Sequence, residues 1–326
     1  MPPSPRTGRL LVLAAAVCFG TTGTAQAFAP DDATPLSVGA ARLAIGAVIL
    51  ALVAHLLDRG DTAPRTFTPT PRTRHFWLGA AGVAAYQPSF FLAVELCGVG
   101  VGTVVALGCA PVITGLLGWG VLGARPSRRW AAATVLAVLG VAALSLSATL
   151  MDDGSAGSAV NGAVNGAVND GDPLRAVAGI GLAVVAAASY AVYTLTAKAA
   201  LDRGAAPPAT VAWMFGGGAV LLAPALLFGD TSWLATPSGL AVAVWLGVVP
   251  TGLAYLLFAE GLRGIRASDA ATLTLAEPAT AATLGVVLLD EPFTAASAAG
   301  TGLIAAGLAV LARGPDRATP EPVPPA

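Results

Sequence analysis

Glu277 is the acidic residue placed deepest inside an apolar stretch of this chain, about ten residues from either end of 268–289. Thr274 and Thr280 stand three residues to either side, so helical spacing puts the three side chains on roughly one face. Pro278 lacks a backbone N–H and leaves a carbonyl free for a substrate or a water. A carboxyl in apolar surroundings favours its neutral form and can bind and release a proton. The sequence therefore predicts substrate binding at Glu277, Thr274 and Thr280, and proton coupling at Glu277. The alternative is that Glu277 pairs with a neighbouring hydroxyl or backbone group and only fixes helix packing.

Aromatic side chains with a polar atom form a second group of candidate binding residues. Tyr190 and Tyr193 share one face of an apolar stretch, Trp213 begins the next stretch, and Tyr255 lies in the one after it. Each supplies ring area plus one hydrogen bond, which suits a pocket for aromatic or amphipathic solutes. The alternative for Trp213 is a place in an interfacial aromatic belt.

Two glutamines are further candidates for contact with a substrate. Gln26 lies four residues after Thr22, so both are on one helical face. Gln87 stands beside Tyr86 within another apolar stretch. We predict that both glutamines line a binding site; the alternative for Gln26 is a hydrogen bond to another helix.

Arg42 allows two interpretations. It balances Asp31 or Asp32 at the outer rim of the protein, or it reaches inward towards an anionic group. The rim is favoured because long cationic side chains near the ends of membrane spans extend towards water.

These residues belong to ten apolar stretches of about 20 residues each. At about 1.5 Å per residue, such a helix crosses a hydrocarbon core of about 30 Å. The chain is 56% hydrophobic and only 11% charged, which excludes an ordinary soluble domain. We predict an all-α membrane protein whose ten transmembrane helices lie near 9–28, 36–57, 75–94, 100–122, 130–149, 176–198, 209–228, 239–258, 268–289 and 295–312.

Positive charge is placed asymmetrically on this series of spans. If the N-terminus is cytoplasmic, all Lys and Arg residues except Arg42 and Arg175 fall on the cytoplasmic side. Short loops rich in Lys and Arg stay in the cytoplasm. We therefore predict a multi-pass protein of the inner (plasma) membrane with both termini cytoplasmic.

The chain divides into two halves with similar sequence patterns. Ala110-Pro111 in the fourth predicted span corresponds to Glu277-Pro278 in the ninth. Because each half has an odd number of spans, the second half enters the membrane from the opposite side, which predicts two inverted five-helix repeats. The expected organisation is a first repeat (9–149), a flexible extracytoplasmic linker (150–173), a second repeat (174–312) and a disordered cytoplasmic tail (313–326).

The whole pattern resembles the drug/metabolite transporter superfamily, in the ten-span group with two EamA-type repeats. The resemblance rests on Phe19-Gly20-Thr21-Thr22-Gly23-Thr24-Ala25, Ala41-Arg42, Gln87 with Phe90-Phe91-Leu92-Ala93, Ala110-Pro111 and Glu277-Pro278. It implies a transporter of amino acids, amines, nucleosides, sugars or drugs. One departure is visible: Gly123-Ala124-Arg125 stands where the second half has Asp290-Glu291-Pro292.

Other classes of function find little support in the sequence. The two histidines, His55 and His75, lie near span ends, and the chain has no zinc cluster, Ser-His pair or nucleotide-binding motif. We therefore expect no enzyme activity, no catalytic residues, no metal and no cofactor. No basic patch with interleaved aromatics occurs, so nucleic-acid binding is not expected. The expected partners are the lipid bilayer and a small-molecule substrate.

We predict a secondary transporter that exports small metabolites such as amino acids, amines or drugs by alternating access. Proton coupling and facilitated diffusion are both compatible with the sequence. The alternatives are an importer or permease of a small metabolite, and a membrane partner protein that transports nothing.

Overall fold

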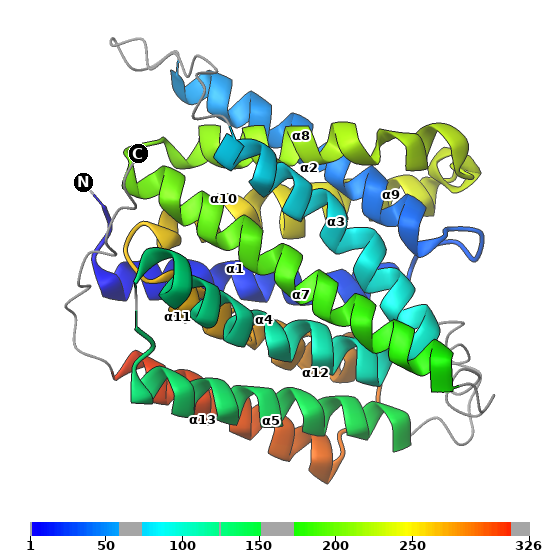
Figure 1. The fold of residues 1–326 in the computed structure, drawn as a ribbon. Coiled ribbons are helices and arrows are strands. Elements are labelled where there is room, and N and C mark those ends of the chain that lie inside the picture. The colour runs from blue at the N-terminus through cyan, green and yellow to red at the C-terminus, as the bar shows by residue number, and fades with distance from the viewer. Residues whose placement is uncertain (1, 59–73, 124, 151–172, 314–326) are drawn as a thin grey trace.

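The computed structural model describes residues 2–58, 74–123, 125–150 and 173–313, and helix labels follow Figure 1. Within these residues, ten helical spans are long and apolar enough to cross a membrane, and no strand occurs. The predicted all-α fold with ten spans is therefore confirmed. The predicted flexible linker and disordered tail fall almost entirely on 151–172 and 314–326, which lie outside the described residues.

Each of the first five spans is a single continuous helix. These are α1 (Pro5–Gln26), α2 (Pro35–Asp58), α3 (Arg74–Cys97), α4 (Val99–Leu122) and α5 (Arg128–Leu150). The sixth, seventh and tenth spans are also continuous, as α7 (Pro173–Asp202), α8 (Pro207–Phe228) and α13 (Ala295–Ala312).

The eighth and ninth spans are interrupted. A short 3₁₀ helix, η2 (Ser232–Ala235), precedes the eighth span, which consists of α9 (Pro237–Gly247), the π-helical segment η3 (Val248–Leu253) and α10 (Ala254–Leu262). The ninth span consists of α11 (Ala267–Leu273) and α12 (Ala276–Leu288). Both interruptions lie near prolines, Pro250 and Pro278, which cannot donate a backbone hydrogen bond.

Proline also marks where many helices start. Pro5, Pro35, Pro173, Pro207 and Pro237 are each the first residue of a helix. The missing N–H costs nothing there, because the first turn has no intrahelical acceptor for it, and the fixed φ suits the helix. Proline thus determines where many of the spans begin, and the apolar residues that follow determine that each helix lies in the membrane.

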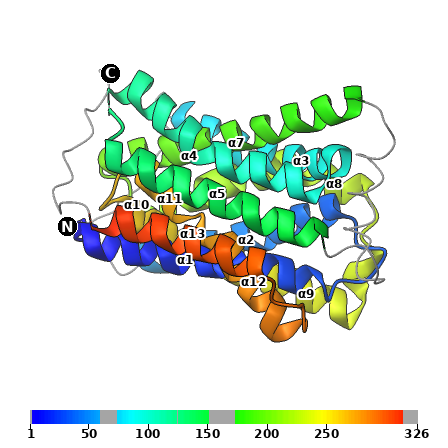
Figure 2. The same ribbon diagram turned by 90° about the horizontal axis from the view of Figure 1, so that it is seen from below.

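The helices run side by side in one bundle, with α2 and α8 along one edge and α5 and α13 along the opposite edge (Figure 1). The view from below shows α5 and α13 lying next to each other (Figure 2). Between these edges, α7 packs against α3 and α4, and α1 packs against α10 and α12. The central apolar core joins α1, α7, α8 and α10 around Tyr193 and Phe258.

Each span of the first half corresponds to the span five positions later, so α1 corresponds to α7, α2 to α8, α3 to α9–α10, α4 to α11–α12 and α5 to α13. The main helix contacts repeat when corresponding spans are exchanged. Contact of α3 with α7 becomes contact of α10 with α1, and contact of α4 with α7 becomes contact of α12 with α1. Contact of α3 with α8 becomes contact of α9 with α2, while the α2–α8 and α5–α13 pairs map onto themselves. The main contacts of the two halves are therefore equivalent.

Candidate functional site

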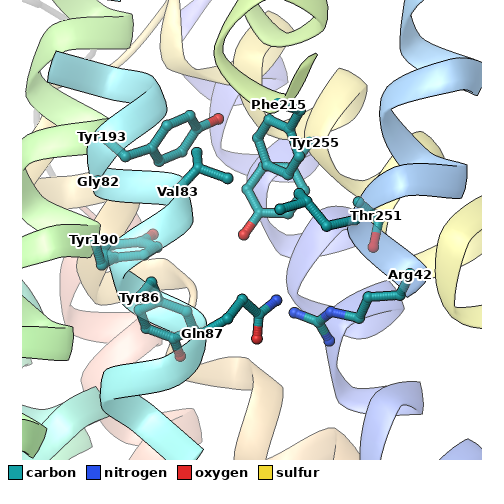
Figure 3. Close-up of a pocket in the computed structure, with 11 residues that line it drawn as sticks. Arg42, Gly82, Val83, Tyr86, Gln87, Tyr190, Tyr193, Phe215, Thr251 and Tyr255 are labelled. Atoms are coloured by element: carbon teal, nitrogen blue, oxygen red, sulfur yellow. The ribbon is translucent and has the colours of Figure 1, made fainter. Parts of the chain in front are cut away.

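A cavity inside the bundle is lined by helices from both halves of the chain (Figure 3). It encloses about 360 Å³ of space between atoms, a volume that includes its open mouth. Its wall comes from α2, α3, α7, α8, η3 and α10 and consists of Arg42, Leu43, Gly82, Val83, Tyr86, Gln87, Tyr190, Tyr193, Phe215, Thr251 and Tyr255.

Aromatic residues are five of the eleven residues that line the cavity. All four tyrosines of the chain line it, together with Phe215. The ring centroids of Phe215 and Tyr255 are 4.2 Å apart, and Tyr193 lies 5.6 Å from Tyr255. Tyr86 and Tyr190 are 6.5 Å apart. Such tilted and edge-on pairs hold one another in place and present a wall suited to a flat apolar solute.

Arg42 of α2 brings a positive charge into the cavity. The oxygen and nitrogen of an amide are assigned from their hydrogen bonds. With its oxygen turned towards Arg42, Gln87 accepts from Nε at 3.0 Å and from Nη2 at 2.8 Å. Figure 3 draws the amide in the opposite sense, with the same two side chains facing each other. Gln87 therefore holds the guanidinium in position without neutralising its charge.

Tyr190 links the cavity to the interrupted ninth span. Its hydroxyl lies 3.2 Å from Thr274 Oγ1, and Thr274 Oγ1 donates to the Ala271 carbonyl at 2.8 Å. Since Thr274 has one hydroxyl proton and gives it to Ala271, Tyr190 must be the donor in the bond that joins them. The wall from α7 is thus tied to the junction of α11 and α12.

Glu277 stands in the first turn of α12, immediately after this junction. Its side chain is half-buried and does not line the cavity. The carboxylate is close enough to Arg42 and Tyr86 to interact with them electrostatically. Within the described residues, its carboxyl forms no hydrogen bond or ion pair, and Thr280 gives its hydroxyl proton to the Ala276 carbonyl instead. Among the described residues, no hydroxyl or backbone group therefore bonds the Glu277 carboxyl.

Thr251 reaches the cavity through the π-helical segment η3. Its hydroxyl donates to the carbonyl of Leu246, five residues earlier, at 2.7 Å. The wider turn accommodates Pro250, whose missing N–H would leave a gap in a regular helix. Irregular backbone at this depth is expected where it borders a cavity.

The comparisons with known proteins identify the family. The model of the family described as "EamA-like transporter family" matches twice, over residues 6–146 and 177–313. The chain belongs to the EamA-like transporter family. It is 41% identical over 307 residues to the "Uncharacterized transporter YwfM" of Bacillus subtilis (strain 168), with 94% of each protein covered. The resemblance to ten-span drug/metabolite transporters is therefore confirmed, and the chain is a multi-pass membrane transporter.

Two further comparisons agree with this assignment. The chain is 28% identical over 311 residues to the "Uncharacterized protein PA1977" of Pseudomonas aeruginosa, covering 95% of each. A solved structure described as "Crystal structure of protein" matches with a TM-score of 0.72 at 22% identity, over 93% of this chain and 95% of that one. At that identity the likeness establishes the fold alone.

The structure of this EamA-like transporter gathers four predicted binding residues at the cavity: Gln87, Tyr190, Tyr193 and Tyr255. It places Thr274, Glu277 and Thr280 on the ninth span beside the cavity. Gln26 is the last residue of α1, and Trp213 of α8 is 49% exposed; neither lines the cavity. In the described residues, no group of three potential metal-ligating side chains occurs.

Several cavity residues were not among the predicted site residues. Phe215 and Thr251 carry no signal in the sequence, because an isolated Phe or Thr in an apolar span is ordinary. Arg42 was assigned to the rim, whereas the structure turns it inward to Gln87 and pairs it with neither Asp31 nor Asp32. The sequence feature that indicates an inward side chain is the position of Arg42, seven residues after the start of α2 at Pro35 and therefore about two turns inside the helix.

Proposed function

We propose that this EamA-like transporter is a secondary transporter that exports small metabolites, such as amino acids, amines or drugs, by alternating access. The observation that carries the proposal is the cavity, whose wall combines α2 and α3 of the first half with α7, α8, η3 and α10 of the second. A site shared by two repeats can open to either face when one repeat moves against the other.

The packing of the bundle supports an inverted repeat. The main contacts between the halves have counterparts when the halves are exchanged: α3–α7 corresponds to α10–α1, α4–α7 to α12–α1 and α3–α8 to α9–α2, as expected for a pseudo-two-fold axis in the membrane plane. The halves differ in their backbone: α3 and α4 are continuous helices, while the eighth span contains η3 and the ninth span is interrupted before Pro278. The interruption gives the second half a weaker backbone beside the cavity, where a conformational change can occur.

The proposed location is the inner (plasma) membrane, with both termini in the cytoplasm. The excess of Lys and Arg on one side supports this orientation. Arg9 Nη1 donates to the Ala312 carbonyl at 2.9 Å, so the start of α1 and the end of α13 share one face of the bundle. With that face cytoplasmic, the loop between α1 and α2 faces outward.

Glu277 is the proposed proton carrier. Its carboxyl is neutral with a proton bound and negatively charged without one. No hydrogen bond to a described residue favours the protonated or the charged form. A proton exchanged at Glu277 would change the electrostatic environment of Arg42 and of the cavity. Facilitated diffusion without a proton remains the second mechanism.

Counterflow in proteoliposomes tests the proposal. Vesicles that contain the purified protein are loaded with an unlabelled mixture of amino acids, amines, nucleosides and aromatic acids, and labelled forms are added outside. We expect protein-dependent uptake of at least one label against an equal total concentration. Absence of exchange for the whole mixture, with folded protein, would favour a partner protein without transport. Loading only one side, in membranes of known orientation, separates an exporter from an importer.

A further inference from the structure

We propose that Arg42 binds the acidic group of the transported solute, so that the cavity takes an organic anion with an aromatic or other flat apolar body. The inference rests on the transport function proposed above and adds the chemical class of the substrate. It starts from one observation: among the described residues that line the cavity, Arg42 is the single charged one.

The hydrogen bonds of Arg42 leave part of its guanidinium available. A guanidinium has five N–H donors. Gln87 accepts from one on Nε and one on Nη2, and no other described residue bonds to the group. Three donors remain, both of those on Nη1 and one on Nη2. A carboxylate can accept from Nη1 and Nη2 together, in the two-bond geometry that makes arginine the usual partner of carboxylates.

No acidic group among the described residues neutralises the charge of Arg42 by direct contact. Arginine stays protonated in proteins, and an unpaired cation within the membrane is costly. Gln87 is neutral, and Glu277 acts on Arg42 through space without an ion pair between them. A solute that brings its own negative charge against the guanidinium therefore gains more from the cavity than a neutral or cationic solute of the same shape.

The rest of the cavity specifies the body of the solute. Tyr193, Phe215 and Tyr255 offer ring surfaces. The Tyr193 hydroxyl is buried and has no hydrogen-bond partner among the described residues, so it can serve a second polar atom of the solute. Ring faces also attract cations. An amine beside Arg42, however, would meet a like charge in a low dielectric, and this disfavours the cationic class.

A matched set of ligands tests this substrate class. Phenylacetate, phenylethanol and phenethylamine share a ring and differ in charge, and phenylalanine adds an ammonium to the carboxylate. Binding to the purified full-length protein is measured by isothermal titration calorimetry. We expect phenylacetate to bind at least about tenfold more tightly than the alcohol and the amine. Binding of phenylalanine compared with phenylacetate shows whether the ammonium contributes. Equal or tighter binding of the amine or the alcohol overturns the proposal, as does failure of both acids to bind.

Substitutions of Arg42 then assign the preference to this residue. R42Q should weaken acid binding by about 10- to 100-fold and leave the alcohol unchanged, while R42K should retain part of the preference. Arg203 is an exposed arginine whose Nη1 bonds the Ala199 carbonyl, and R203Q serves as the control that should bind like the parent protein. An unchanged preference in R42Q, with alcohol binding intact as proof of folding, contradicts the proposal.

The same ligands separate this inference from the transport function. If counterflow exchanges an amine or a neutral solute and no acid, transport stands and the acid-binding role of Arg42 fails. If the acids bind through Arg42 but none is exchanged, the binding site stands and the transport function fails.

Discussion

Tyr190 donates a hydrogen bond of 3.2 Å to Thr274, and this bond spans from the cavity wall on α7 to the junction of α11 and α12. Thr274 is also the residue whose carbonyl lies four positions before Pro278, where the proline ring prevents a regular helical bond. Instead, the backbone N–H of Glu277 donates to the Thr274 carbonyl at 2.9 Å, three residues along the chain rather than four. A side chain in the proposed substrate site is therefore joined to the point at which the ninth span is interrupted.

Removing the Tyr190 hydroxyl should reduce the transport rate much more than it reduces the stability of the protein. In Y190F the Thr274 hydroxyl keeps its bond to Ala271, so we expect a loss of stability of only about 1 kcal/mol. Exchange should fall several-fold if the bond couples the cavity to the ninth span. The measurements are the counterflow rate and the unfolding midpoint in detergent.

Y193F is the matched control for the stability of Y190F. The Tyr193 hydroxyl is buried without a partner among the described residues, so its removal should leave stability unchanged or raise it slightly. A larger destabilisation in Y193F than in Y190F would contradict the described hydrogen bonds.

The close approach of α1 to α12 depends on Gly20. A methyl group there would lie 2.8 Å from the Glu277 carbonyl oxygen and 2.5 Å from Thr280 Cβ. We expect G20A to destabilise the protein by about 1–3 kcal/mol, because the two helices must separate. Thermal unfolding in detergent measures this loss.

Gly23 provides the control on the same helix. A methyl group at this position would meet nothing within 4 Å. G23A should therefore be neutral, or stabilising by up to about 1 kcal/mol, since alanine favours the helix. Equal effects of G20A and G23A would contradict the described packing of α1 on α12.

A hydrogen bond between Trp233 and Ser37 holds η2 against α2. The fully buried indole Nε1 donates to Ser37 Oγ at 3.0 Å. S37A leaves this N–H without a partner and should cost about 1–3 kcal/mol. Ser238 is exposed, so S238A should change the unfolding midpoint little. If S37A is as stable as S238A, the indole is not bonded as described.

Glu277 should control how transport depends on pH. In the parent protein, we expect the exchange rate to vary with pH as Glu277 takes up and releases a proton beside Arg42. E277Q is uncharged at every pH and should show a flat profile while still exchanging substrate. Glu95 is an exposed acid on α3, and E95Q should keep the parent profile. An unchanged profile in E277Q would exclude Glu277 as the proton carrier.

The membrane potential should drive export of an acidic substrate. Moving one negative charge outward across 100 mV, negative inside, gains about 2.3 kcal/mol. Proteoliposomes loaded with the labelled acid and given an inside-negative potassium diffusion potential should release it faster than vesicles without a potential. Slower release would contradict net outward movement of negative charge.

The spans and the family could be predicted from the sequence, because long apolar stretches and the position of Lys and Arg report directly on the bilayer. Candidates such as Tyr190 and Gln87 were also recognised, since polar atoms inside a span are rare. The position of Arg42 about two turns inside α2 indicates an inward side chain, but its partner could not be predicted, because Gln87 belongs to a different helix. Likewise, nothing local in Phe215 reveals that Tyr255 lies 4.2 Å from it.

The most direct test of the account is whether the cavity opens to both sides of the membrane. Val83 lines the cavity, so V83C is made in a protein whose three native cysteines, all free, are replaced by alanine. A membrane-impermeant thiol reagent is then added to one side at a time. Alternating access predicts that the new cysteine is labelled from either side and is protected by an excess of transported solute. Labelling from one side alone, or from neither, in active protein would contradict it.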